Sequence, residues 1–191
     1  RTDADSDGLF ADRLHFNGTR VWQKPVQLKA PGESFIDDAL VTGSGRVLAV
    51  GATVTGGKQS AYKALAWFIS PDGSAENLDV GTEAAVLHAV HLDNSEGETI
   101  AAGAVFESGG GTQNSKTTMW LVKLGGNGGL LSQHKFGSAP GARLLGLADG
   151  DSTDSLFAVG ATDAAEKGVV CRTQVTNLQA TMCTPYLANS P

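Results

Sequence analysis

The chain is low in charge, has only two cysteines and contains no long apolar run. Asp, Glu, Lys and Arg make up 18% of its 191 residues, whereas about a quarter is usual for a globular domain. The 14 Lys and Arg residues are scattered and are outnumbered by 20 Asp and Glu residues. This balance excludes the basic stripe that nucleic acid or an anionic membrane requires. No apolar run reaches the length of about 18 residues that a membrane-spanning helix needs.

The chain is instead rich in glycine and apolar residues. The chain has 25 glycines and 41% hydrophobic residues, which is too apolar for a disordered protein. This composition is typical of many short strands joined by tight turns, and the length suits one domain with a substantial core.

One short phrase occurs three times, as VLAVGAT, TIAAGAV and LFAVGAT. It places glycines at Gly51, Gly103 and Gly160, with spacings of 52 and 57 residues. A second landmark, Asn-Gly or Asp-Gly between two apolar runs, keeps a spacing of 55 residues and ends at Gly18, Gly73 and Gly128. These dipeptides are strong hairpin signals, because the favoured primed turns need a positive φ. Two landmarks with one period predict an internal repeat.

Each unit contains four short apolar runs. In the first complete unit they are FIDDALVT, GRVLAVGATV, YKALAWFIS and AENLDV. The second run is apolar on both faces, so it needs a sheet packed on each side. A four-stranded meander of about 50 residues that repeats face to face predicts a β-propeller blade. A β-sandwich would not keep this period, and a β-solenoid repeats at about 20–30 residues.

The unit resembles those of bacterial-type secreted β-propeller repeat proteins, in which AVGAT is followed by a WLVKL…NG hairpin. Here the hairpin reads TTMWLVKLGGNGGLLSQHKFG, and the resemblance extends from Leu9 to Tyr186. It implies an all-β propeller of four-stranded antiparallel blades, with an incomplete ring in this chain. We expect a single partial propeller over residues 1–191, with a half-blade at about 9–28 and blades at about 35–80, 86–136 and 143–186.

The count of blades predicts a partner. About three and a half blades are present, whereas closed rings need about four to eight. The opening hairpin lacks its first and second strands, and a homodimer would lack the same strands twice. We therefore expect this chain to be a fragment of a longer polypeptide, cut before Arg1. A companion chain would complete a ring of about seven or eight blades.

Two cysteines, Cys171 and Cys183, lie twelve positions apart on either side of TNLQ. If that segment turns a hairpin, the two face each other across antiparallel strands at a separation that a disulfide can bridge. The alternative is two buried reduced thiols. A disulfide, with the low Lys content, favours an extracytoplasmic location, either secreted or periplasmic.

The segment DADSDG presents carboxylates at alternate positions before a glycine, at Asp3, Asp5 and Asp7. Such a loop can turn several oxygens onto one Ca²⁺ ion. The pattern is incomplete, because the twelfth position, where an EF-hand places Glu, is Leu14. The alternative is a solvated acidic turn. We expect no cofactor other than Ca²⁺.

Two other polar motifs have simpler explanations. NGT at Asn17 matches a glycosylation sequon, but a hairpin turn followed by a strand Thr explains the same residues. His88 and His91 would point to opposite faces of a strand, so they could not hold one ion together.

The sequence identifies no catalytic residue, and it contains no G-x-S-x-G elbow. We expect a non-catalytic extracellular scaffold that binds another protein or a carbohydrate through the segments TVTGGKQSAY, VFESGGGTQNSKTT and TDAAEKG on one rim. The alternative is the propeller portion of a secreted hydrolase or oxidoreductase with its catalytic groups elsewhere. Buried acids or a metal in the central channel would favour the enzyme, whereas an apolar or Gly-lined channel would favour the scaffold.

Overall fold

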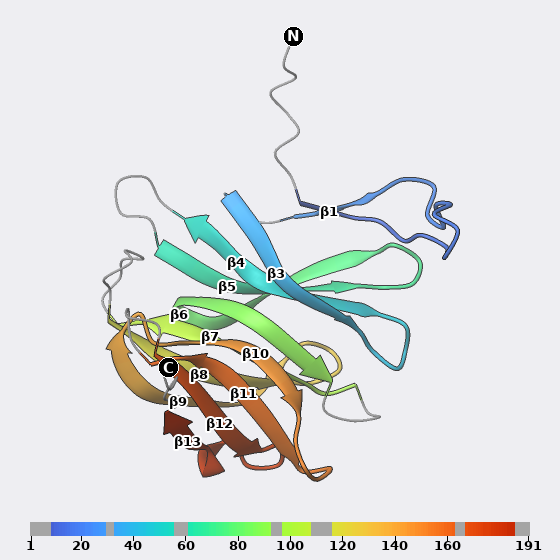
Figure 1. Cartoon of the computed structure of the whole chain (residues 1–191). Coiled ribbons are helices and arrows are strands. Elements are labelled where there is room, and N and C mark those ends of the chain that lie inside the picture. The colour runs from blue at the N-terminus through green and yellow to red at the C-terminus, as the bar shows by residue number, and fades with distance from the viewer. Residues whose placement is uncertain are drawn as a thin grey trace, which may run out of the picture.

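The computed structural model describes residues 9–29, 33–55, 61–92, 97–107, 116–162 and 167–185. These residues form antiparallel β-sheets with one short 3₁₀ helix, η1 (Leu178–Ala180), so the all-β prediction is confirmed (Figure 1). They form no closed ring, and the propeller stays a prediction. In the described part of the chain, no helix has the length and apolar character needed to cross a membrane.

The strands belong to three sheets of two, seven and four strands. The two-stranded sheet is the hairpin of β1 (Leu9–Ala11) and β2 (Val26–Leu28). The seven-stranded sheet contains, in order, β3 (Glu33–Val41), β4 (Val47–Thr55), β5 (Ala61–Ile69), β6 (Ala75–Leu92), β7 (Thr99–Phe106), β8 (Lys116–Leu124) and β9 (Leu130–Pro140). The four-stranded sheet contains β10 (Arg143–Asp149), β11 (Ser155–Ala161), β12 (Gly168–Gln174) and β13 (Met182–Pro185).

The long strand β6 divides the seven-stranded sheet into two layers. Its residues 75–79 pair with β5, and its residues 85–92 pair with β7. Between them Gly81 has a φ of +78°, a conformation that side-chain-bearing residues rarely adopt. We call β3–β5 with residues 75–80 the first layer, residues 84–92 with β7–β9 the second, and β10–β13 the third.

The layers pack face to face (Figure 1). Between the first and second layers, Leu48 and Val50 of β4 share one buried cluster with Val122 of β8. Between the second and third, Ile100 of β7 packs in a cluster with Ala158 of β11. The hairpin β1–β2 covers the opposite side of the first layer in a third cluster. Strand β4 is thus buried on both faces, as its sequence predicts.

Each layer pairs its first two strands in the same register. A β-bulge interrupts each first strand, and a glycine of the second strand lies beside it. A Cβ atom at this glycine would lie only 1.9–2.0 Å from a backbone carbonyl oxygen of the first strand. The three glycines and the residues that carry these oxygens are Gly51 and Phe35, Gly103 and Val86, and Gly160 and Arg143. Only glycine fits at so close a backbone approach.

The Asn-Gly and Asp-Gly dipeptides do form hairpin turns, with φ of +82°, +88° and +83° at Gly18, Gly73 and Gly128. The turn type differs from the prediction. Each glycine N–H donates to the carbonyl three residues earlier, as from Gly73 to Ser70 at 2.9 Å. The glycine therefore follows the turn rather than occupying its centre, and its positive φ restores the strand pairing at a G1-type position.

Candidate functional site

The first strands of the three layers carry a row of carboxylate and imidazole groups. The bulges fall at Asp37 in β3, His88 in β6 and Leu145 in β10. A bulge interrupts the alternation of side chains along a strand and can re-aim the extra residue. We call Asp37, Asp38, His88, His91 and Asp149 the inner-strand row.

The strongest contact of the inner-strand row joins two bulged residues. Nδ1 of His88 lies 2.6 Å from Oδ2 of Asp37, and the two side chains are 22% and 31% exposed. As an N–H group, Nδ1 donates to the carboxylate and so fixes the orientation of the ring. Among the described residues, Nε2 of His88 has no hydrogen-bond partner.

The other members of the row also join neighbouring layers. Oδ2 of Asp38 accepts a hydrogen bond of 3.0 Å from the backbone N–H of Val90. Nε2 of His91 lies 3.0 Å from Oδ1 of Asp149, whose side chain is 92% exposed. So exposed a pair adds little stability. Most of the row's polar groups are therefore occupied by contacts between layers.

The inner-strand row can offer an oriented imidazole to a ligand. A neutral imidazole held at Nδ1 accepts a hydrogen bond at Nε2, and a protonated one donates. The structure brings no group of three or more His, Cys, Asp or Glu side chains into a metal-binding arrangement within the described ranges. The geometry suits hydrogen bonding to a polar ligand.

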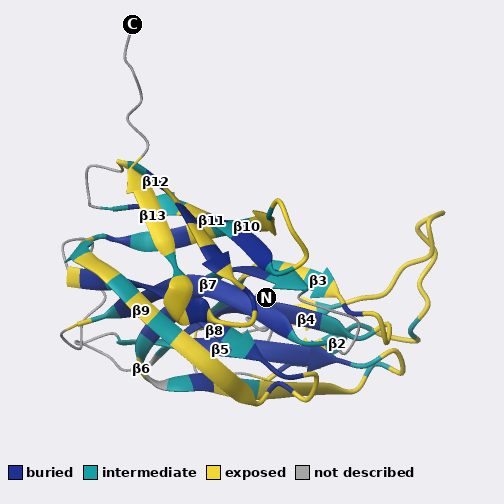
Figure 2. Ribbon diagram, turned by 90° about the horizontal axis from the view of Figure 1, so that it is seen from below, coloured by how far each residue is buried: buried dark blue, intermediate teal, exposed yellow. Residues whose placement is uncertain are grey.

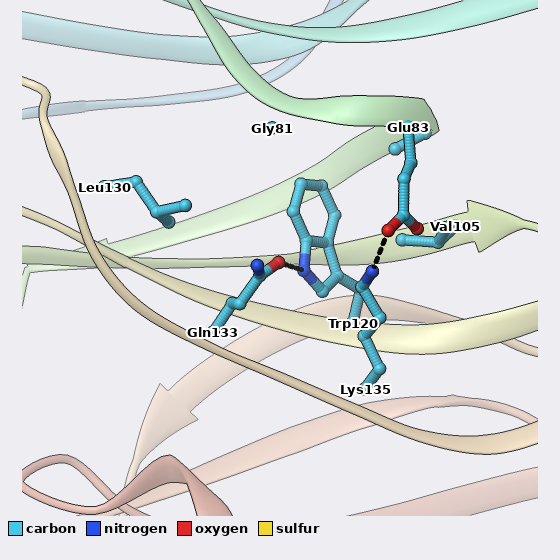
Figure 3. Close-up of a pocket in the computed structure, with 8 residues that line it drawn as sticks. Gly81, Glu83, Val105, Trp120, Leu130, Gln133 and Lys135 are labelled. Atoms are coloured by element: carbon cyan, nitrogen blue, oxygen red, sulfur yellow. Dashed lines mark hydrogen bonds and ion pairs between the residues drawn. The ribbon is translucent and has the colours of Figure 1, made fainter.

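A cavity of about 250 Å³ lies beside Trp120 of β8 (Figure 3). The indole N–H of Trp120 donates to Oε1 of Gln133 at 3.0 Å, and Nζ of Lys135 lies 2.6 Å from Oε1 of Glu83. Trp120 itself is buried. Ligand pockets usually measure about 300–1,000 Å³ and present unpaired polar groups. This cavity is smaller, and its polar groups bind one another, so it is the weaker candidate.

Glu107, at the end of β7, accepts hydrogen bonds from three donors. They are the hydroxyl of Ser138, the hydroxyl of Thr118 at 2.6 Å and the ammonium group of Lys116 at 2.9 Å. These hydrogen bonds, with that of Ser138 contributing most, lower the pKa of Glu107 from 4.5 to about 2. The ionised carboxylate ties β7, β8 and β9 together at this end of the second layer.

The residues predicted from sequence fall in three different places. Asp3, Asp5 and Asp7 of the expected Ca²⁺ loop lie outside the described residues. Cys171 and Cys183 face each other in register on β12 and β13, and their sulfurs are bonded at 2.10 Å.

The third prediction, the sequon at Asn17, lies in an exposed hairpin turn. Oδ1 of Asn17 accepts hydrogen bonds from the backbone N–H and the hydroxyl of Thr19, at 3.0 and 2.7 Å. These contacts match the hairpin interpretation of the motif, in which the Asn side chain stabilises its own turn.

Sequence reasoning missed the pair of Asp37 with His88. It treated the strand that contains His88 and His91 as regular, whereas a bulge interrupts it at His88. A signal was available: Asp37 precedes Gly51 by 14 residues, and His88 precedes Gly103 by 15. Alignment of the units on these glycines would have placed the two residues within one position of each other.

Comparison with known proteins gives no family for this chain. No protein-family model matches it, and no curated protein resembles it significantly. The fold and the geometry of the inner-strand row are therefore the features that bear on function.

Proposed function

We propose that this chain is part of a β-propeller that serves as an extracellular scaffold for binding another protein or a carbohydrate. The observation that carries the proposal is the common construction of the three layers. Each has a bulged first strand, a glycine against that bulge and apolar residues on both faces of its second strand. Layers built alike and packed face to face are the elements of a propeller.

The inner-strand row supports ligand binding by this scaffold. In a propeller the first strands line the central channel, so the row would face it. Asp37 orients the ring of His88 and leaves Nε2 open toward a ligand hydroxyl or amide. Asp38 and His91 already bind groups of neighbouring layers. A site with one open hydrogen-bonding group suits recognition of a polar ligand better than multi-residue catalysis.

The disulfide between Cys171 and Cys183 supports a secreted or periplasmic location. Disulfides form and persist in oxidising compartments and are rare in the cytosol. Carbohydrates and the surfaces of other secreted proteins are the ligands available there. We further propose that the chain acts within a larger processed assembly.

One observation favours an alternative function. A histidine held by a carboxylate with its second nitrogen open is also the arrangement of a general base. In that case the chain would be the propeller portion of a secreted hydrolase or oxidoreductase. The remaining catalytic groups would lie on another segment or chain.

Two variants separate these functions. We expect His88→Gln to weaken binding to a panel of immobilised oligosaccharides and secreted proteins, because it removes the open ring nitrogen. His134→Gln makes the same chemical change on β9, where His134 stacks on Phe136, and should leave binding unchanged. Turnover of chromogenic ester or glycoside substrates that only His88→Gln abolishes would replace the scaffold by the enzyme.

A further inference from the structure

The third layer has an apolar face that no described residue covers. We call Phe157, Val159, Val170 and Met182 the open face. Val159 is 46% exposed, Val170 37% and Met182 70%, and Phe157 is half-buried. They come from three adjacent strands, since Val159 pairs with Val170 and Met182 with the partner of Phe157. Figure 2 shows β13 exposed along its described length.

The opposite face of the same strands is buried. Leu156 and Ala158 of β11 and Val169 and Cys171 of β12 pack against the second layer. Strand β11 is therefore apolar on both faces, like β4 of the first layer. A strand of this composition needs a sheet on each side, and on one side the described residues provide none.

Three of the four residues of the open face occupy positions that are fully buried in the other two layers, whereas Met182 corresponds to the exposed Glu76 and Ser132. Counted from the glycine beside each bulge, Val159 corresponds to Val50 and Ala102, both 0% exposed. The residues opposite these three on the third strand of each layer also differ in burial. Val170, opposite Val159, corresponds to two residues that are also 0% exposed, Ala66 and Leu121.

In the first and second layers, the next layer along the chain covers these positions. The first layer's residues share a cluster with the second layer, and the second layer's with the third. In the third layer the corresponding positions form the open face, and no described layer covers them. Apolar side chains are more stable when buried than when exposed to water, so an uncovered apolar face is unfavourable.

One position beside the open face is charged in both the second and the third layer. Arg172 pairs with Phe157 on the neighbouring strand, and Lys123 holds this register position in the second layer. Each cation has a carboxylate in its own layer, since Nζ of Lys123 lies 2.9 Å from Oε2 of Glu98 and Nη2 of Arg172 lies 2.6 Å from Oδ1 of Asp151. Lys123 is only 15% exposed, so a cation at this position is compatible with a covering layer.

We propose that the open face docks a further four-stranded antiparallel sheet, carried by a companion chain and built like the first three. This inference rests on the proposed propeller and names the surface through which it continues. The covering sheet presents small apolar residues to Val159 and Val170.

Hydroxyl-radical modification measures the cover directly. The chain produced alone is compared with the native assembly purified from its source, and oxidation of Phe157 is quantified by mass spectrometry. We expect Phe157 to be oxidised in the isolated chain, and its oxidation in the assembly to fall to that of the buried Phe68, because its counterparts Leu48 and Ile100 are 0% exposed in the covered layers. Phe16, fully exposed on the hairpin turn, should stay equally reactive in both. Equal oxidation of Phe157 in both preparations would overturn the proposal.

Reconstitution tests the residues and the partner. Isolated chain is added to the dissociated native assembly, and the masses of the products are measured under native conditions. We expect wild type and Leu131→Lys to reassemble with the companion chain and Val159→Lys not to, with all three melting alike. Leu131 is 54% exposed and lies on β9, away from the open face. Reassembly of Val159→Lys would contradict the inference.

The native mass also decides between occupants. A native preparation that contains only 19.6 kDa chains, as monomers or as a symmetric dimer, would overturn the companion chain. Electron microscopy of the assembly separates this inference from the proposed function. Protection of Phe157 by a companion in a particle without a ring would remove the propeller and leave the open face as a docking surface.

Discussion

Gly103→Ala should destabilise the protein far more than an ordinary substitution of glycine in a strand. Gly103 lies beside the bulge in β6, where a Cβ atom would stand 1.9 Å from the carbonyl oxygen of Val86 and 2.9 Å from Cα of Leu87. Carbon–oxygen contacts in sheets are normally about 3.3–3.6 Å. Because both neighbours are backbone atoms, no side-chain rotation relieves the overlap, and the strands must separate by about 1.4 Å.

The expected loss follows from three terms. Overpacking in a close-packed region costs about 1–3 kcal/mol. Separation of β6 from β7 leaves a buried backbone group without its partner, at about 1–3 kcal/mol. Alanine regains about 0.5–1 kcal/mol because it restricts the unfolded chain. The free energy of unfolding should therefore fall by about 3 kcal/mol, which lowers the melting temperature by about 6–12 °C in a chain of this size.

Urea titration followed by circular dichroism measures this loss, with Gly43→Ala as the matched control. Gly43 lies in the exposed turn between β3 and β4, and a Cβ atom there meets nothing within 4 Å. We expect Gly51→Ala and Gly160→Ala to lose as much stability as Gly103→Ala. If Gly103→Ala and Gly43→Ala differ by less than about 0.5 kcal/mol, the close backbone approach is not what requires glycine.

Three other predictions concern single groups. Glu107→Gln should lower stability at neutral pH and flatten the loss of stability on acidification. With a folded pKa of about 2, below the ordinary 4.5, the carboxylate stabilises above pH 4.5 and loses that contribution toward pH 2; melting curves that keep the wild-type pH dependence would contradict this. Replacing Cys171 and Cys183 by alanine should cost up to about 3 kcal/mol for so short a loop, and non-reducing peptide mass spectrometry that finds two free thiols would refute the bond. If the loop with Asp3, Asp5 and Asp7 binds Ca²⁺, chelator should lower the melting temperature and Ca²⁺ restore it in wild type but not in Asp5→Ala; no shift at millimolar Ca²⁺ would remove the site.

The strands of the first layer could be predicted closely from the sequence. The run GRVLAVGATV covers all of β4 except Thr55, and YKALAWFIS covers most of β5. Strand formation and turn position are largely local properties, set by apolar runs and by glycine after Asn or Asp. The turn type was predicted wrongly, because the same glycine satisfies a positive φ either within the turn or directly after it.

The candidate site could not be predicted in the same way. Asp37 and His88 meet because two layers stack and because each residue occupies a bulge. A single strand pattern does not reveal a bulge, so the contact of His88 with Asp37 was not predicted. His88 and His91 do contact layers on opposite sides of their own layer, in agreement with the predicted alternation. The burial of a strand residue also depends on the stacking of layers. Val50 and Val159 occur in the same sequence motif, but a layer covers Val50 and none of the described residues covers Val159.

By itself the sequence determined the all-β class and the places of the hairpins, and it predicted that Cys171 and Cys183 face each other if TNLQ turns a hairpin, because each depends on residues close together along the chain. The tertiary structure alone decided the contact of Asp37 with His88, 51 residues apart, and the exposure of the open face. These depend on which layers stack and in which order. Contacts between layers join side chains far apart in sequence, so no local pattern specifies them.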